Sequence, residues 1–316
     1  MRYGFYLPTR GPAATSEGLT AIVQRGEALG FHSVVVADHI VFPTVIRSSY
    51  PYTVSGEFPG EGDALELLPL MAFVAGVTSR LRIVSSVMIV PYRNPVVTAK
   101  MLATIDVLSR GRVTVGVGVG WLREEFEAVG AASFERRGAV TDEYVRIFKT
   151  LWTKSPASYA GEFYQFDSLR CLPQPLQKPH PPIWIGGHSA VALRRVARLG
   201  DGWHPVGANP AVPLRPDELR ASLDELRRLT AAEGRDFSRL TISFKAPVYD
   251  ASADAATLPD GGRRPFSGSP AQIGEDIAAY GALGVSELIF DFRSPTAAEV
   301  IERMERFAGE VLARVT

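Results

Sequence analysis

The sequence predicts an α/β protein folded as a (β/α)8 TIM barrel with insertions, and three observations lead to this fold. About eight short runs rich in valine and isoleucine alternate with longer amphipathic segments, which is typical of parallel strands joined by helices. The length of 316 residues accommodates the roughly 250 residues of a typical barrel. No polar linker divides the alternation, so we expect one domain over residues 1–316.

The strands are expected where short apolar runs occur. Several runs are apolar at successive positions, as in parallel strands that are buried on both faces. The expected strands are 3–7, 33–37, 81–87, 113–117, 182–185, 202–205, 240–246 and 287–292.

The helices are expected between the strands, and their ends carry recognisable signals. Asn94 can cap the helix that Pro95 opens. Gly30 and Gly200 stand where a helix often ends in a left-handed residue. The expected helices are 17–29, 65–78, 95–108, 134–152, 190–199, 216–233, 271–283 and 296–313.

Two stretches exceed a minimal barrel. Residues 156–181 are rich in proline and are expected to form an ordered insertion before the fifth strand. Residues 247–270 are expected to form a flexible loop after the seventh strand. In a barrel this loop lies on the catalytic rim, where lids are usually found.

The composition excludes several partners. The 34 basic and 34 acidic residues balance, which gives no field to attract nucleic acid or an anionic membrane. No apolar run reaches the roughly 18 residues of a membrane helix, and no signal peptide is expected before the first strand. The one cysteine, Cys171, cannot form an intramolecular disulfide and is expected to act as a small apolar residue. These features favour a cytoplasmic protein.

Asp38 and His39 directly follow the second expected strand. In a barrel this position lies on the active-site face. A histidine there can exchange a proton near neutral pH, and the neighbouring carboxylate can raise its basicity or bind a polar ligand. The alternative is a loop histidine beside a helix cap.

A glycine cluster ends the fourth expected strand, from Gly116 to Gly120, and Trp121 follows it. Alternating glycines remove side chains from one face, so a flat ligand could approach the backbone. Close packing between strand and helix is the alternative. The complete dinucleotide fingerprint is absent.

A second glycine motif, Gly186-Gly187-His188-Ser189, joins the fifth expected strand to a helix. Glycines and a hydroxyl at a helix start present free N–H groups to an anion, most often a phosphate. A tight turn with Ser189 as an ordinary cap is the alternative. A serine hydrolase is disfavoured, because Val191 stands where its nucleophile motif needs glycine.

The remaining polar residues give weaker signals. The five histidines show no zinc-binding spacing, so no metal site is expected. The segment 201–204 is either a polar rim group or a turn before a buried tryptophan. Arg293 binds an anionic substrate or faces solvent, and Glu124 and Glu125 are interpreted as a helix face.

Taken together, these segments resemble the luciferase-like monooxygenase superfamily, and specifically its branch of coenzyme F420-dependent oxidoreductases. The resemblance covers most of the chain. It is carried by the order and spacing of six motifs: 37–39, 86–95, 108–112, 116–126, 181–187 and 200–203.

The resemblance implies a bacterial luciferase-like barrel, usually a homodimer, that binds coenzyme F420 or, alternatively, FMN. It places the phosphate on Gly186, Gly187, His188 and Ser189, and a non-proline cis peptide at Ser86-Val87 behind the ring. Asp38 would line the ring, and His39 would carry the substrate proton. The residues flanking the ring would be Gly118, Val119, Gly120 and Trp121.

The function implied is hydride transfer between the deazaflavin and a small organic substrate. Three alternatives stay open: an FMN-dependent monooxygenase that uses reduced flavin and oxygen, a phosphate-binding barrel such as an aldolase, and a non-catalytic flavin-binding protein. A phosphate-binding barrel such as an isomerase or aldolase predicts a reactive lysine or paired carboxylates at the rim, and Lys245 is the one lysine within an expected strand. The loops after strands one, two, seven and eight would recognise the substrate, with candidates at Thr9, Arg10, Phe42, Pro43, Arg263, Arg264 and Arg293.

Overall fold

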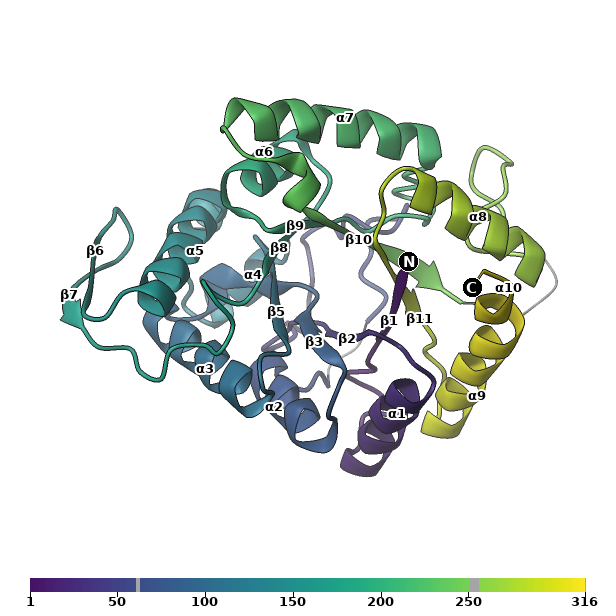
Figure 1. Ribbon diagram of the computed structural model, residues 1–316, viewed down its shortest axis with the longest axis horizontal. Coiled ribbons are helices and arrows are strands. Elements are labelled where there is room, and N and C mark those ends of the chain that lie inside the picture. Colours follow the sequence, from purple (N-terminus) through teal and green to yellow (C-terminus); the bar gives the residue numbers. More distant parts are fainter. Residues whose placement is uncertain (61–62, 250–255, 316) are drawn as a thin grey trace.

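The centre of the protein is a closed ring of parallel strands (Figure 1). The structure is a computed structural model that describes residues 1–60, 63–249 and 256–315. Neighbouring strands pair in the order β3-β2-β1-β11-β10-β9-β8-β5, and the pairing of β3 with β5 closes the ring. The predicted (β/α)8 barrel is therefore confirmed. The ring strands are β1 (Arg2–Tyr6), β2 (Ser33–Val36), β3 (Arg82–Ser85), β5 (Val113–Gly118), β8 (Ile183–Gly186), β9 (Gly202–His204), β10 (Thr241–Val248) and β11 (Glu287–Asp291).

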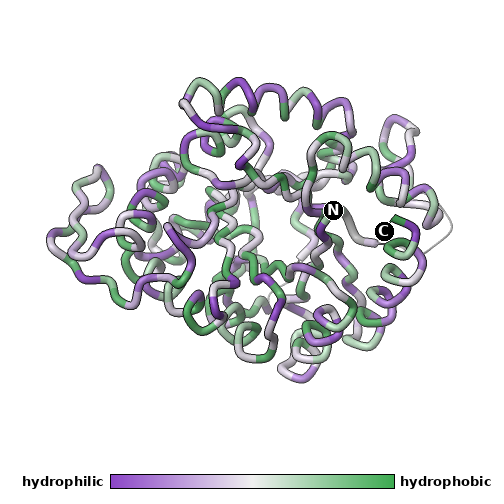
Figure 2. Tube along the Cα trace, viewed as in Figure 1, coloured by the Kyte–Doolittle hydropathy of each residue, from purple (hydrophilic) through white to green (hydrophobic). Residues whose placement is uncertain are grey.

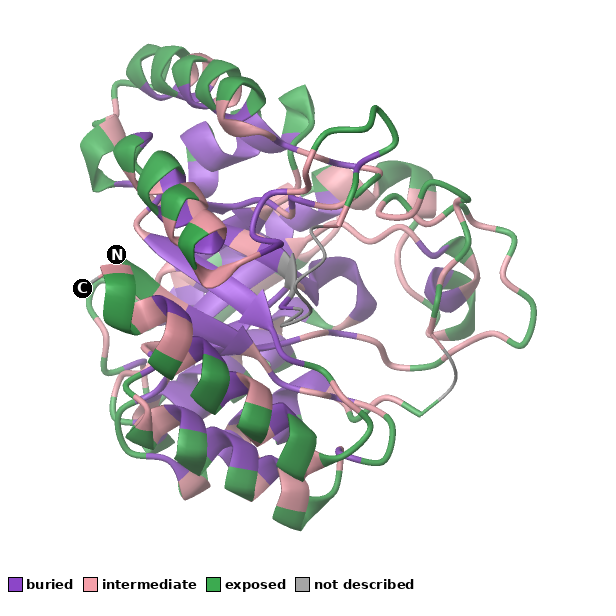
Figure 3. Cartoon of the chain, turned by 90° about the vertical axis from the view of Figure 1, so that its right-hand side faces the viewer, coloured by how far each residue is buried: buried purple, intermediate pink, exposed green. Residues whose placement is uncertain are grey.

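Helices surround the ring and bury their inner faces against it, while their outer faces are exposed (Figure 3). The Asn94 side chain accepts hydrogen bonds from the amides of Val96 and Val97, as predicted. Gly30 is left-handed, with φ of +84°, whereas Gly200 is extended because the chain continues directly into β9. The helices are α1 (Ser16–Ala28), α2 (Leu67–Val77), α3 (Pro95–Leu108), α5 (Arg137–Thr153), α6 (Ala190–Leu199), α7 (Pro216–Ala232), α8 (Pro270–Ala282) and α9 (Ala297–Phe307).

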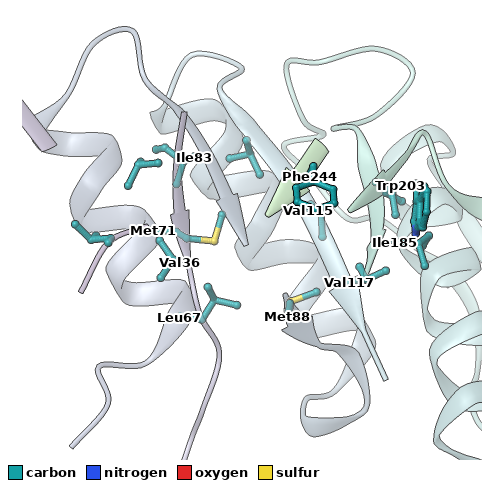
Figure 4. Packing of buried hydrophobic residues seen from close by; sticks show 14 of the residues in the cluster. Val36, Leu67, Met71, Ile83, Met88, Val115, Val117, Ile185, Trp203 and Phe244 are labelled. Carbon is teal, nitrogen blue, oxygen red and sulfur yellow. The ribbon is translucent and has the colours of Figure 1, made fainter. Parts of the chain in front are cut away.

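The core has two layers because successive residues of a strand point to opposite faces. Val35 and Val84 pack with Trp184 and Ile289 in one cluster, while their neighbours Val36 and Ile83 belong to the larger one. Figure 4 shows Leu67 and Met71 of α2 beside Val36. Hydrophobic residues recur along the strands and along the inner sides of the helices (Figure 2). Burial of each such side chain contributes about 1.5–3 kcal/mol.

Several elements depart from the predicted pattern. The chain adds β4 (Met88–Ile89) after β3 and α4 (Arg123–Ala128) after β5. The expected terminal helix changes after α9 into a π-helical turn, Ala308–Leu312, and then α10 (Ala313–Val315). The short strand and helix escape prediction because neither is long enough to show a hydrophobic period.

The first insertion is ordered, as predicted, and contains the hairpin of β6 (Ala157–Ala160) and β7 (Gln165–Leu169). This hairpin lies outside the ring of helices (Figure 1). The Glu143 carboxylate of α5 accepts three amide hydrogen bonds from the hairpin loop, from Glu162, Phe163 and Tyr164. Cys171 follows the hairpin as a free, buried thiol in the core, which confirms its expected apolar role.

The second insertion was expected at 247–270, and its residues 250–255 lie outside the described residues. Beyond them, the chain forms an antiparallel bridge between Thr257 and Arg263. The Arg263 guanidinium also pairs with Asp276 of α8, at 2.7 Å. The described end of this insertion is therefore attached to the helix that follows it.

Gly116 is required by the close approach of β3 and β5. A methyl group there would lie 2.0 Å from the carbonyl oxygen of Ser85. Gly116→Ala is expected to lower the free energy of unfolding by about 1–3 kcal/mol, because the two strands must separate. Gly76→Ala is the matched control, since Gly76 is an exposed position of α2 where an added methyl meets nothing within 4 Å. It should stabilise the protein by about 0.5–1 kcal/mol. Urea unfolding measures both, and equal effects would contradict the packing argument.

Candidate active site

A pocket of about 350 Å³ opens at the carboxyl ends of the ring strands, the end of a barrel where active sites lie. Tyr6 ends β1, Gly186 ends β8 and Asp291 ends β11, so residues far apart in the sequence meet here. We call this the first pocket. Seven predicted site residues line it: Asp38, His39, Ser86, Val87, Trp121, Gly186 and Gly187.

A second pocket of about 370 Å³ lies beside the start of α6. Gly186 and Gly187 line both pockets, so the two meet at the end of β8. The predicted residues Gly118, Val119 and Ser189 line the second pocket. Gly120 and His188 line neither of the two.

The peptide bond between Ser86 and Val87 is cis, as the family resemblance implied. The Ser86 hydroxyl lies 2.9 Å from Nε2 of His204, and Nδ1 of the same ring lies 2.9 Å from the carbonyl oxygen of Ser243. Burial, with Lys245 nearby, lowers the pKa of His204 to about 4, so the ring is neutral and holds Ser86 in place. His204 and the Trp203 beside it are both buried.

The Val87 side chain fills the space that Gly118 and Gly186 leave open. An added methyl would lie 2.5 Å from Val87 at Gly118 and 2.9 Å from it at Gly186. At Gly116 the obstacle is the Ser85 carbonyl. These glycines therefore allow close packing against Ser85 and Val87, whereas the alternative considered for Gly116 to Gly120 was packing against a helix.

His39 is oriented by a buried carboxylate. Its Nδ1 lies 2.9 Å from Oε2 of Glu125, which also accepts a hydrogen bond from the Tyr92 hydroxyl at 2.9 Å. Oε1 of Glu125 accepts the Ile40 amide at 2.7 Å and the Val41 amide at 3.2 Å. Burial opposes ionisation of Glu125, but the hydrogen bonds from His39, Ile40 and Tyr92 outweigh it and hold its pKa below the usual range. Since Glu125 binds Nδ1, the His39 ring keeps Nε2 for a ligand in the pocket.

Asp38 is held in a buried ion pair. Its two carboxylate oxygens accept hydrogen bonds from the Arg93 guanidinium at 2.6 and 2.7 Å, and one also accepts the Ile89 amide at 2.8 Å. Arg93 pairs in addition with Glu66, at the start of α2. This network joins the ends of β2 and β4 to the loop that enters α2.

Aromatic side chains from the loop after β2 cover the pocket beside His39. The ring of Phe42 lies 4.5 Å from that of His39, and Phe58 stacks on Phe42 at 5.6 Å. Tyr50 and Phe58 both contact Trp121, at 4.9 and 5.3 Å. The wall is apolar and packs against one side of His39, whose side chain is 15% exposed.

Glu124 fixes this loop to the barrel. One of its oxygens accepts the amides of Arg47 and Ser48, and the other accepts the Ser48 hydroxyl at 2.7 Å. Glu124 and Glu125 do lie on a helix, α4, as interpreted, but both bind the loop after β2 and Glu125 is completely buried.

The second pocket has the features of an anion site. α6 begins at its edge with Ser189 as the N-cap, and the first amides of a helix lack partners within it. Gly187 has φ of +91°, which favours glycine, and its carbonyl accepts the indole N–H of Trp203 at 2.7 Å. Arg137 and Arg195 line the same pocket.

The guanidinium groups of this pocket differ in their pairing. Arg195 forms an ion pair with Asp142, whereas Arg137 donates to the carbonyl oxygens of Gly120 and Phe134 at 3.1 and 2.8 Å. Glu135, the acid lining this pocket, pairs with Arg123. Among the described residues of this pocket, Arg137 is therefore an arginine without a carboxylate partner, so its charge is available to a ligand.

Sequence reasoning missed Glu125, Arg137 and the position of Lys245 in the first pocket. One signal could have indicated Glu125. It lies shortly after the carboxyl end of β5, and the carboxyl ends of the barrel strands share the face that also holds Asp38 and His39. Its partner lies 86 residues away in the sequence, so local patterns could not show the pairing. Arg137 opens α5 and is one of several arginines there, and nothing in the sequence distinguishes it.

Two further observations concern the described ranges as a whole. Among these residues, no group of three or more histidine, cysteine, aspartate or glutamate side chains is placed to hold a metal ion. No helix built from them is long and apolar enough to cross a membrane.

Comparison with known proteins identifies the family. The family model described as luciferase-like monooxygenase matches residues 1–267. An uncharacterized protein of Mycobacterium tuberculosis is 33% identical over 304 residues, covering 93% of this chain and 94% of that protein. An FMNH2-dependent dimethylsulfone monooxygenase of Pseudomonas putida is 27% identical over 319 residues, covering 85% of each chain. The structure of a coenzyme F420-dependent tetrahydromethanopterin reductase from Methanopyrus kandleri superposes with a TM-score of 0.77 at 13% identity, covering 100% and 99% of the two chains. The chain belongs to the luciferase-like monooxygenase family.

Proposed function

We propose that this protein is an oxidoreductase that uses coenzyme F420 and transfers hydride to or from a small organic substrate. The observation that carries the proposal is the pair of His39 and buried Glu125 at the edge of the first pocket. Hydride transfer at an alcohol or carbonyl carbon also requires a proton to move at oxygen, and a carboxylate-oriented histidine suits that task. The likeness in fold to an F420-dependent reductase supports this choice.

The residues fit an extended cofactor with a ring at one end and a phosphate at the other. The first pocket would take the ring against Val87, and the second would take the phosphate at the start of α6. We assign the phosphate end to Gly186, Gly187, Ser189 and Arg137. Flanking contacts would come from Asp38, Ser86, Gly118, Val119 and Trp121. Contacts from Gly120 and His188 stay predictions, since these two line neither pocket.

When bound, the deazaflavin supplies the hydride chemistry, and the protein moves the proton. Glu125 holds Nδ1 of His39, so Nε2 accepts the hydroxyl proton of an alcohol and returns it in the reverse reaction. The negative charge of Glu125 stabilises the ring once it is protonated. The aromatic wall of Phe42, Phe58 and Trp121 keeps water from competing for that proton.

The sequence also predicts a catalytic role for Asp38, and its surroundings support a positioning role instead. The Asp38 carboxylate accepts two hydrogen bonds from Arg93 and one from Ile89, so both of its oxygens are already bound by other parts of the protein. We propose that Asp38 fixes the backbone beside His39 and the strand after the Ser86-Val87 bond.

A second candidate is an FMN-dependent monooxygenase that uses reduced flavin and oxygen. The FMNH2-dependent relative from Pseudomonas putida favours it, because that relative matches 85% of this chain. The two pockets would accept FMN in the same orientation. In this case His39 would protonate or deprotonate groups of the substrate during oxygen chemistry.

Titration of the purified protein with each cofactor tests the proposal. Coenzyme F420 and FMN, each oxidised and reduced, are added separately and followed by absorbance and fluorescence. The proposal expects saturable F420 binding that exceeds FMN binding by about 10-fold or more, a difference of about 1.4 kcal/mol. Tight FMN binding without a response to F420 would favour the monooxygenase. Binding of either cofactor without turnover of any alcohol or ketone would favour a carrier.

We also propose that the protein is a homodimer, as the family resemblance implied. An exposed apolar stripe along α3 and the segment after β7 supports this, consisting of Val97, Met101, Leu108, Leu172 and Leu176. Burial of such a stripe against a second copy removes apolar surface from water.

Leu108→Lys is expected to shift the protein from twice the chain mass toward the chain mass in light scattering. Val54→Lys, on a residue of the loop after β2 that is 71% exposed against 63% for Leu108, should leave the mass unchanged. A wild-type protein with the mass of one chain would contradict the proposal.

A further inference from the structure

The wall of the first pocket opposite Val87 carries basic side chains. β10 is the fourth strand from β3 in either direction around the ring, through β2, β1 and β11 or through β5, β8 and β9. Lys245 of β10 therefore lies across the pocket from the bulge at Ser86 and Val87. Arg293, just after β11, and Arg264 line the same pocket.

Lys245 has an ammonium group that the described residues leave without an ion pair. Its Nζ lies 4.1 Å from the centre of the Tyr6 ring, and within the described ranges no oxygen accepts a hydrogen bond from it. Burial lowers the pKa of Lys245 to about 8, partly offset by Asp291. A half-buried ammonium with three unused donors is costly unless an anion joins it.

The acids that line the pocket are committed elsewhere. Both carboxylate oxygens of Asp38 bind Arg93. Asp291 accepts the backbone amide of Arg293 at 2.9 Å and its Nε at 2.8 Å. The charge of Lys245 is therefore not neutralised by either acid of the first pocket.

We propose that the substrate is a small organic anion, a carboxylate or sulfonate, whose charged group binds Lys245 beside Arg293 while its reacting carbon lies toward His39. The placement of the reacting carbon near His39 rests on the proposed function. The placement of the anion at Lys245 rests on the pocket alone. The aromatic lining from Tyr6, Tyr50, Tyr52 and Trp121 would hold an apolar body between the two ends.

Calorimetry with paired probes tests the inference on the F420-loaded protein. The anions acetate, benzoate and methanesulfonate are compared with the neutral acetamide, benzamide and methanesulfonamide. At least one anion is expected to bind about 10-fold or more tightly than its neutral partner, as for hydrogen bonds to charged groups. Absence of binding by all three anions, or equal binding within every pair, would overturn the inference.

Two lysine variants separate the site from a general charge effect. Lys245→Met is expected to abolish the preference for the anion, while the melting temperature and the affinity for F420 stay near those of the wild type. Lys154→Met removes the same charge from an exposed lysine after α5 and should keep the preference. A preference that survives Lys245→Met would overturn the assignment of the anion to this residue.

The pH dependence gives an independent readout. Affinity for benzoate is expected to fall as pH rises through about 8, where Lys245 loses its proton. Two groups near Lys245 do not titrate in this range, because burial raises the pKa of Tyr6 well above its usual range and lowers the pKa of His204 to about 4. Asp291 is paired with Arg293, and the Arg293 guanidinium stays charged. Among these described groups, Lys245 is the one whose charge is expected to change near pH 8. An affinity that is flat over this range would contradict its role.

The same measurements without cofactor distinguish this inference from the proposed function. If the protein fails to bind F420 but still prefers benzoate through Lys245, the anion site stands and the hydride-transfer proposal fails. If F420 binds and no anion is preferred, the anion site fails and the proposed function stands.

Discussion

Replacement of His39 by alanine is expected to lower turnover by about 10²–10⁴-fold, the usual contribution of a positioned acid–base group, while cofactor affinity is retained. His39 lines the first pocket through a ring whose Nδ1 is bound to Glu125, so its loss removes the proton carrier and leaves the second pocket intact. Turnover is measured with the fastest substrate from a panel of alcohols and ketones with and without a carboxylate group.

His180→Ala is the control for this variant. His180 lines neither pocket, and its Nδ1 lies 2.9 Å from the carbonyl oxygen of Pro181. Its replacement should leave turnover unchanged, whereas added imidazole should restore part of the activity of His39→Ala. Full activity in His39→Ala would remove the proposed proton transfer, and loss of cofactor binding would show a structural role instead.

Glu125→Gln should lower turnover to a similar extent, about 10²–10⁴-fold, although Glu125 does not itself line the pocket. The glutamine oxygen can still accept the amides of Ile40 and Val41, but its NH2 group then faces Nδ1 of His39. An NH2 group donates, so the His39 ring must carry its proton on Nε2 and can no longer accept one there. Glu125 is therefore a positioning residue.

Glu124→Gln makes the same change one residue earlier and is the matched control. Glu124 binds Arg47 and Ser48 rather than His39, so turnover should stay near that of the wild type. Nitrogen NMR of His39 should show the proton on Nδ1 in the wild type and on Nε2 in Glu125→Gln. An unchanged tautomer together with normal turnover would contradict the positioning role.

Much of the barrel could be predicted from the sequence because its strands are buried on both faces. Runs such as Val34-Val35-Val36 are continuous and apolar, and the helices between them carry strong end signals such as Asn94-Pro95. β4 has only two residues, and its place is set by pairing with β5. A local pattern of that length cannot specify a strand.

The candidate site likewise contains residues that the local sequence indicates and residues that only the folded barrel reveals. Asp38, His39 and Gly186 could be predicted from their position directly after or at the end of a strand. The roles proposed for Glu125 and Lys245 depend on the closed barrel. Glu125 meets a partner 86 residues away, and Lys245 lies across the pocket from β3. The neutral total charge likewise gave no sign of the lysine, Lys245, that lines the first pocket.

The central claim is that the two pockets hold one cofactor, with the ring against Val87 and the phosphate at the start of α6. A crystal structure of the protein with coenzyme F420 measures this directly. The account predicts the ring in van der Waals contact with Val87, within about 4 Å, and a phosphate oxygen within about 3 Å of the Gly187 or Ser189 region. A phosphate bound instead beside Lys245 and Arg293, or a ring outside the first pocket, would contradict it.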